Sequence, residues 1–305
     1  MKEHERIDLM RREIGRRVIG NKDVIEDILI CILSSGHILI ESPPGLGKTL
    51  MARTIAEIMD MAFKRIQCTP DLAPRDIIGD MYSDEELGGR FFGAGPLFTN
   101  VLLVDEINRA QPKTQSAFLE AMSERSVTVA GQTHILPEPF FVIATQNPIE
   151  CEGTYPLPEA QQDRFLLKSH MTYLTPDDER EAIKSSVSSV KVSKLFTPAE
   201  VLAIQERIKS EIDVPDGVID SIIALAAASR ARKEVVAGAS TRATVLYTKA
   251  VKTRAFLMGG RQATTQDVVE LAHPILRHRL VMNQDSKNFG FSADHLIDDL
   301  IRKTF

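Results

Sequence analysis

The 305-residue chain has no tryptophan, 6% aromatic residues and only three cysteines, Cys31, Cys68 and Cys151. None of the cysteines belongs to a CxxC pair or to a Cys/His spacing typical of a zinc site, so structural thiols are the interpretation we favour. The chain also lacks an apolar run near the ~18 residues that a membrane helix needs. Its first residues, MKEHERIDLMRRE, are charged throughout and lack the apolar core of a signal peptide. We therefore expect a cytoplasmic protein with no membrane span.

A strong charge of one sign is missing as well. The formal net charge of −5 weakens the case for general nucleic-acid binding, although it does not exclude a local basic patch. The clearest patch lies in a predicted N-terminal helix, residues 5–17, and consists of Arg11, Arg12, Arg16 and Arg17. A solvated or partner-facing helix surface is the interpretation that we favour over a nucleic-acid contact.

The length of the chain favours two domains, since 305 residues exceed one ordinary core. Up to residue 172, short apolar segments alternate with helical patterns, which predicts a parallel α/β sheet. From Thr175 onward, helix starts follow one another and no strand pattern recurs. We therefore predict an α/β domain over residues 1–172 and a helical domain over residues 173–305.

Local signals add detail to this division. Asn21 is a candidate cap for a helix that follows it, and Thr197 with Glu200 has the pattern of a capping box. A later helix is predicted over residues 265–280, with a kink at Pro274.

The segment HILIESPPGLGKTLMARTIA, residues 37–56, has the pattern of a buried strand, a glycine-rich loop and an amphipathic helix. Gly45 and Gly47 allow the loop to curl around a phosphate with its N–H groups pointing inward. The helix that begins near Lys48 offers unpaired N–H groups and a positive dipole end. Lys48 can reach the β- and γ-phosphates, and Thr49 can ligate Mg²⁺. The pattern predicts ATP/ADP binding with Mg²⁺ by Pro44, Gly45, Leu46, Gly47, Lys48, Thr49 and Leu50.

One position departs from the usual phosphate-loop pattern, which has glycine where this chain has Ser42. If the backbone there requires a positive φ, serine is slightly strained; otherwise nothing is lost. We expect that the serine does not abolish binding.

Two acidic residues, Asp105 and Glu106, follow the apolar run VLLV, which is typical of a central parallel strand. Asp105 is expected to hold Mg²⁺, and Glu106 to polarise the water that attacks the γ-phosphate. Asn147 follows the predicted strand FFVIAT. Because parallel strands deliver their carboxyl ends to one crevice, its amide is a candidate for orienting that water. A simple Asn-Pro turn is the alternative.

The motifs SPPGLGKT, LLVDEINRA, ATQNP, PEAQQDRF and GASTRA, in this order, resemble those of AAA+ ATPases, and most closely the MoxR group. The resemblance covers nearly the whole chain. It implies a P-loop NTPase sheet, the AAA+ module, followed by an all-α lid, and a homo-oligomeric ring that is usually hexameric. It also implies a helix-2 insert and a hairpin before the sensor-1 strand, for which residues 79–96 and 127–136 are in the matching positions.

Further site residues depend on this resemblance. Arg164 of QQDRF matches the arginine finger, which reaches a neighbouring subunit's nucleotide and offsets charge on the transferred phosphoryl group. Arg242 of GASTRA matches the sensor-2 arginine, which couples the lid to the γ-phosphate. From spacing alone, each arginine would be an ordinary helix-end ion pair. The segment that matches the adenine-lining backbone is Val18, Ile19 and Gly20.

The resemblance implies a Mg²⁺-dependent ATPase that couples hydrolysis between subunits to chaperone-like remodelling or maturation of partner protein complexes. Members of the group are often paired with proteins that contain a von Willebrand factor A domain. One alternative is a nucleic-acid-dependent motor, which the net negative charge of the chain makes less favoured. Another is a nucleotide-gated scaffold with little turnover. The expected catalytic set, which argues against the scaffold, is Lys48, Glu106, Asn147, Arg164 and Arg242.

Overall fold

The computed structural model describes residues 3–84, 89–148, 153–186 and 190–305. The chain separates into two compact units, each assembled from several segments. The first unit consists of Met1–Ile25, Leu39–Leu157 and His170–Leu202. The second unit consists of Glu26–Ile38, Pro158–Ser169 and Ala203–Phe305. A domain boundary after residue 172 remains a prediction.

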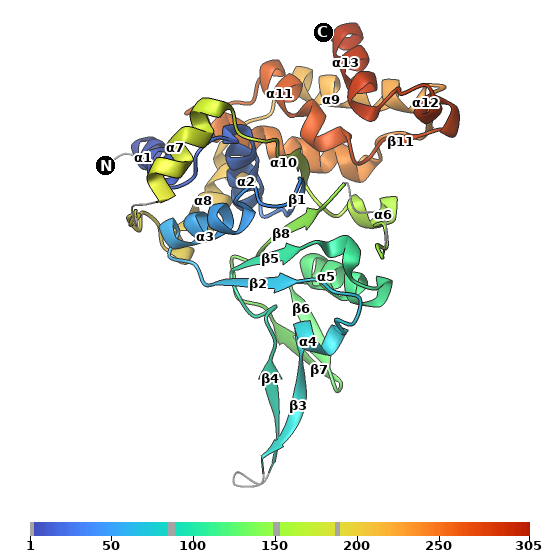
Figure 1. Cartoon of the computed structure of the whole chain (residues 1–305). Coiled ribbons are helices and arrows are strands. Elements are labelled where there is room, and N and C mark those ends of the chain that lie inside the picture. Colours follow the sequence, from blue (N-terminus) through green and yellow to red (C-terminus); the bar gives the residue numbers. More distant parts are fainter. Residues whose placement is uncertain (1–2, 85–88, 149–152, 187–189) are drawn as a thin grey trace. The chain divides into compact units, whose positions relative to one another are not determined.

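The predicted parallel sheet is present, with the strand order β2-β5-β8-β1-β9 (Figure 1). β2 pairs in parallel with β5, and β5 pairs in parallel with β8. Every residue of β5 is buried, as a central strand covered on both faces requires. The strands are β1 (Ile38–Glu41), β2 (Phe63–Gln67), β5 (Val101–Asp105), β8 (Phe141–Gln146) and β9 (Leu167–His170).

Two hairpins of the first unit match segments singled out in the sequence. β3 (Gly79–Asp84) pairs with β4 (Gly89–Ala94), and this hairpin projects away from the sheet (Figure 1). β6 (Ser126–Val129) pairs with β7 (Gln132–Ile135) and precedes β8 in the chain.

Helices of the first unit include α3, which contacts β2 and β5. Asn21 was expected to cap α2 (Lys22–Leu33), and this expectation is wrong. Its amide instead exchanges hydrogen bonds with the backbone of Thr172, at 3.3 and 3.2 Å. The other helices that begin in this unit are α1 (Glu3–Gly15), α3 (Lys48–Ile58), α4 (Pro74–Ile78), the 3-10 turn η1 (Ile107–Arg109), α5 (Pro112–Glu124), α7 (Pro176–Ser186) and α8 (Pro198–Glu211).

The predicted capping box at the start of α8 is confirmed. A carboxylate oxygen of Glu200 accepts from Thr197 N at 2.8 Å, and Glu200 N donates to Thr197 Oγ1 at 3.3 Å.

The second unit is mainly helical, as predicted, and its long helices pack on one another. α11 ends at Leu276 rather than at residue 280, with Pro274 inside its last turn. A two-stranded antiparallel pair, β10 with β11, was not predicted. The elements are α6 (Glu159–Gln162), α9 (Asp216–Arg230), β10 (Val235–Ala237), α10 (Thr241–Leu257), α11 (Thr265–Leu276), β11 (Val281–Met282), α12 (Gln284–Asn288) and α13 (Ala293–Thr304).

Two of the three cysteines can be placed in this fold. Cys31 and Cys68 are buried free thiols, and burial raises the pKa of Cys68 to about 12, as expected of structural thiols. Cys151 lies outside the described residues. Among helices in the described ranges, none combines the length and apolar character needed to cross a membrane.

Candidate functional site

The glycine-rich loop joins β1 to the N-terminus of α3. Gly45 and Gly47 both have φ of 81°, a left-handed conformation that glycine adopts without strain. A Cβ added to either glycine would meet no heavy atom within 4 Å, so the loop backbone borders open space. Gly47 is also the N-cap of α3, whose first N–H groups have no partner within the helix. These features together form a cradle suited to an anion.

Lys48, the first residue of α3, lies across this cradle. Its ammonium donates to Ser42 Oγ at 2.7 Å and to the Pro43 carbonyl at 3.1 Å. Burial lowers the pKa of Lys48, while the charges of Asp105 and Glu106 raise it. Ser42 is buried and does not belong to the described non-glycine residues with positive φ. Serine is therefore unstrained at this position, and its hydroxyl holds the lysine.

Asp105 ends β5 with its side chain buried and fixed from two sides. Thr145 Oγ1 donates to Asp105 Oδ1 at 2.6 Å, from the neighbouring strand β8. Arg65 Nη2 donates to the other oxygen at 2.8 Å, from the neighbouring strand β2. The carboxylate that is expected to serve Mg²⁺ is thus positioned by the sheet itself.

Glu106 leaves the strand direction, because its backbone is left-handed with φ 55° and ψ 52°. Its N–H donates to Thr145 Oγ1 at 2.9 Å. Its carboxylate accepts from Gln67 Nε2 at 2.9 Å and pairs with Arg109 at 3.4 Å. Glu106 is therefore held in place beside Asp105, with its carboxylate partly accessible to solvent.

Sequence reasoning missed the residues that hold these acids. The signal was available in β2, where the polar Arg65 and Gln67 flank the apolar Ile66 at the carboxyl end of the strand. In the parallel register Gln67 lies opposite Asp105, so polar side chains of β2 reach the same edge of the sheet.

Asn147 directly follows β8 and is buried. The preceding residue, Gln146, accepts a hydrogen bond from Ser42 N at 3.0 Å through its carbonyl. The end of β8 therefore lies beside the start of the phosphate loop. Thr49 is half-buried in the first turn of α3.

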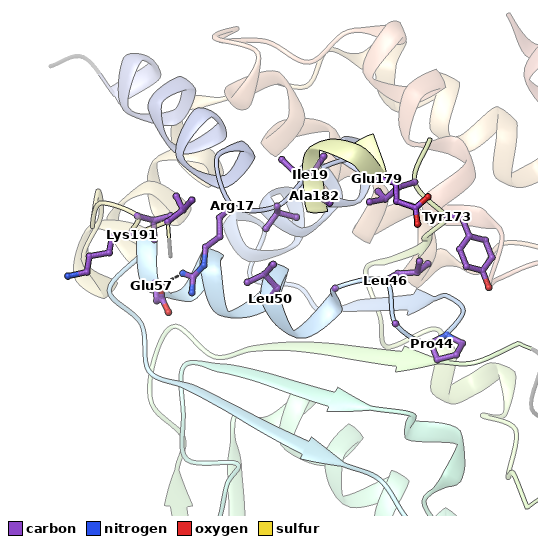
Figure 2. Close-up of a pocket in the computed structure, with 16 residues that line it drawn as sticks. Arg17, Ile19, Pro44, Leu46, Leu50, Glu57, Tyr173, Glu179, Ala182 and Lys191 are labelled. Carbon is purple, nitrogen blue, oxygen red and sulfur yellow. Dashed lines mark hydrogen bonds and ion pairs between the residues drawn. The ribbon is translucent and has the colours of Figure 1, made fainter. Parts of the chain in front are cut away.

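A pocket of about 840 Å³ opens along α3 within the first unit (Figure 2). Its size is within the range common for small-molecule sites. Gly20 allows the side chain of Leu174, which lines the pocket, to pack closely against the backbone. A Cβ at position 20 would lie only 2.4 Å from Leu174. The lining includes seven residues predicted to bind the nucleotide: Val18, Ile19, Pro44, Gly45, Leu46, Gly47 and Leu50.

The residues present fit a magnesium nucleotide. No cluster of three or more His, Cys, Asp or Glu side chains suited to a metal occurs among the described residues. Mg²⁺ bound with a nucleotide needs few protein ligands, since phosphate oxygens and waters complete its octahedron. Thr49 and Asp105 can supply those few ligands.

The two predicted arginines belong to the second unit. Arg164 is exposed in the turn after α6, and Arg242 is exposed in the first turn of α10. Their sequence neighbours meet, since Ser240 Oγ donates to Asp163 Oδ2 at 3.5 Å. The structure thus groups Lys48, Asp105, Glu106 and Asn147 within one unit, and the two arginines within the other.

Comparisons with known proteins agree with this architecture. The family described as "ATPase family associated with various cellular activities (AAA)" matches residues 37–167, and the AAA lid domain matches residues 227–300. Chaperone MoxR1 of Mycobacterium tuberculosis is 39% identical over 300 residues, which are 95% of this chain and 79% of that protein. The uncharacterized protein YeaC of Bacillus subtilis is 37% identical, and the match covers 94% of this chain and 91% of YeaC. A crystal structure described as a candidate ATPase from Cytophaga hutchinsonii has a TM-score of 0.93 at 39% identity, covering 98% of this chain and 94% of that chain.

Proposed function

Because the chain belongs to the MoxR family of AAA+ ATPases, we propose that it binds Mg²⁺–ATP at its phosphate loop and hydrolyses it to ADP and phosphate. The observation that carries this proposal is the geometry of the loop, in which two left-handed glycines lead into the N-terminus of α3 and the Lys48 ammonium lies 2.7 Å from Ser42 Oγ. The pocket that begins at Gly45 and Gly47 supports the same assignment, because it continues to the predicted adenine-lining segment.

Each residue of the phosphate loop has a defined part in binding. Lys48 and the first N–H groups of α3 face the phosphates, where positive charge is favoured. Val18, Ile19 and Leu50 offer apolar surface to the base. Thr49 and Asp105 hold Mg²⁺, which when bound neutralises charge on the phosphate oxygens.

Hydrolysis requires an activated water close to the γ-phosphate. Glu106 accepts a proton from that water, and its orientation by Gln67 supports the role. Asn147 orients the same water through its amide, from the adjacent strand end.

We further propose that subunits form a ring, hexameric as is usual for the group, in which Arg164 of one subunit acts on the nucleotide of the next. Arg242 couples the helical part of the same chain to the γ-phosphate. ATP hydrolysis by the ring drives remodelling of partner protein complexes in the cytoplasm. A protein with a von Willebrand factor A domain is a candidate partner. The name of the mycobacterial relative, a chaperone, supports this choice of client.

Three variants test the proposal. Glu106→Gln should bind ATP normally and lose turnover, because only the proton acceptor is removed. Arg164→Ala should also bind ATP and lose about 10³–10⁵-fold in turnover, as removal of an arginine finger does. Lys48→Ala should fail to bind. Normal turnover in Glu106→Gln, or unchanged ATP affinity in Lys48→Ala, contradicts the assignment.

Mixing variants tests whether subunits share a site. A Lys48→Ala subunit has an intact Arg164 to offer, and an Arg164→Ala subunit has an intact pocket. The mixture should therefore recover part of the activity that each variant lacks. Affinity capture with Glu106→Gln and ATP then identifies the client, while turnover that DNA stimulates in a salt-dependent way would favour the nucleic-acid motor.

A further inference from the structure

Arg279, just beyond the end of α11, is a buried arginine whose guanidinium faces the turn that carries Arg164. Its side chain is 2% exposed. Arg279 Nε donates to Asp163 Oδ1 at 2.7 Å, Nη2 donates to the Phe165 carbonyl at 2.6 Å, and Nη1 donates to the Leu166 carbonyl at 3.1 Å. One side chain thus holds the Asp163 carboxylate before Arg164 and two backbone carbonyls after it.

A second buried residue of the same segment, His278, also contacts the turn of Arg164. His278 Nε2 lies 3.1 Å from the Phe165 carbonyl, which is also held by Arg279. Burial lowers the pKa of His278 well below its ordinary value, and the neighbouring guanidinium adds to that effect. The imidazole is therefore neutral, and its Nε2–H donates to the carbonyl.

The turn needs such support because regular structure gives it little. α6 is only four residues long and ends at Gln162. A buried charge is costly unless it is paired and hydrogen-bonded, and an apolar side chain would fill the same space at less cost. What arginine adds is a planar fork of N–H donors that fixes several acceptors at once.

We propose that Arg279 is a positioning residue for Arg164. By holding Asp163, Phe165 and Leu166, it fixes the direction in which the Arg164 side chain leaves the turn. This inference rests on the proposed function, in which Arg164 acts on the nucleotide of a neighbouring subunit.

The same cluster connects the turn to the helix that carries Arg242. Asp163 accepts from Arg279 through one carboxylate oxygen and from Ser240, the N-cap of α10, through the other. The charge of Arg242 also contributes to lowering the pKa of Arg279. Asp163 therefore contacts both Arg279 and the first turn of the helix that carries Arg242, within the second unit.

Arg279→Gln in the full-length protein tests the inference. Glutamine keeps a polar side chain but loses the fork and the charge. ATP affinity should remain that of the wild type, and turnover should fall about 10²-fold, as misplacement of a catalytic group by about 1 Å does.

Mixed assemblies separate positioning of the finger from other roles. If Arg279 acts through Arg164, adding Lys48→Ala subunits restores turnover to Arg279→Gln, because they bring a correctly held finger. Adding Arg164→Ala subunits restores nothing. The reverse pattern, or no recovery with either partner, overturns the inference.

A matched control is Arg254→Gln. Arg254 forms a partly buried ion pair with Asp267 in the same unit, and among the described residues no hydrogen bond joins its side chain to the turn of Arg164. This variant should lose thermal stability and keep its turnover. If it loses turnover as Arg279→Gln does, general loosening of the unit explains both results and the inference fails.

Two further arms keep the outcomes distinct. The mixture of Lys48→Ala with Arg164→Ala reports on the finger alone, so its failure to recover rejects the proposed function rather than the role of Arg279. Should Arg279→Gln not fold, Arg279→Lys keeps the charge for Asp163 with fewer donors. It should show a smaller loss of turnover that Lys48→Ala subunits also repair, and a loss that they leave unrepaired contradicts the inference.

Discussion

Replacing Ser42 by alanine removes the hydroxyl to which the Lys48 ammonium donates at 2.7 Å. The Pro43 carbonyl at 3.1 Å is the acceptor that remains for the ammonium. A hydrogen bond to a charged group contributes about 1.5–3 kcal/mol to stability. Because Lys48 is only half-buried, the lower end applies. We expect Ser42→Ala to lower the free energy of unfolding by about 1.5 kcal/mol.

Ser42→Gly should be less stable still, although glycine is the usual residue at this position of a phosphate loop. The backbone of Ser42 does not have a positive φ, so glycine gains nothing there. It adds an entropic cost of about 0.5–1 kcal/mol relative to alanine. The expected order of stability is wild type, then alanine, then glycine.

Unfolding by urea without nucleotide measures this order, and a fluorescent nucleotide analogue measures affinity in the same variants. We expect Ser42→Ala to bind ATP at least as tightly as the wild type, because Lys48 no longer has the hydroxyl as a competing acceptor. A glycine variant as stable as the wild type would refute the backbone reasoning. A tenfold loss of affinity, about 1.4 kcal/mol, would mean that the hydroxyl directs Lys48 toward the phosphates.

Other predictions concern the backbone, the core and the charge of the second unit. Gly47→Ala should cost about 1–2 kcal/mol of stability, since φ is 81° there, and urea unfolding measures it. Leu103→Ala, on the fully buried strand β5, should cost about 2–5 kcal/mol in the same assay. Hydrogen bonds to Asp294, and then to Asp298, raise the pKa of His273 above its ordinary value. Its contribution to stability is therefore fully present below about pH 6.5 and is lost as pH rises through the raised value, and thermal midpoints of His273→Gln should lack that slope.

The sheet and the phosphate loop could be predicted because their signals are local. β5 extends the predicted run VLLV by one residue, and β8 is shifted by one residue relative to the predicted strand FFVIAT. A strand, a loop with two left-handed glycines and a helix lie next to one another in the chain. A short window of sequence therefore contains the whole phosphate-binding motif. The assignment of Lys48 follows from that window.

The short strand pair of the second unit could not be predicted for the opposite reason. β10 has three residues and β11 has two, too few to establish an alternating pattern. Their partners are also distant in sequence, with Val235 opposite Met282. The same distance hid the ion pair of Asp163 with Arg279, whose residues are 116 positions apart.

Adjacent acids show most clearly what spacing leaves undetermined. In a regular strand, Asp105 and Glu106 would point to opposite faces of the sheet. The left-handed backbone of Glu106 ends that alternation where β5 ends. Asp105 is then fixed between two neighbouring strands, while Glu106 turns to meet Gln67 and Arg109. One acid is thereby suited to hold a metal in a constant position, and the other to exchange a proton with water, although the chain presents them side by side.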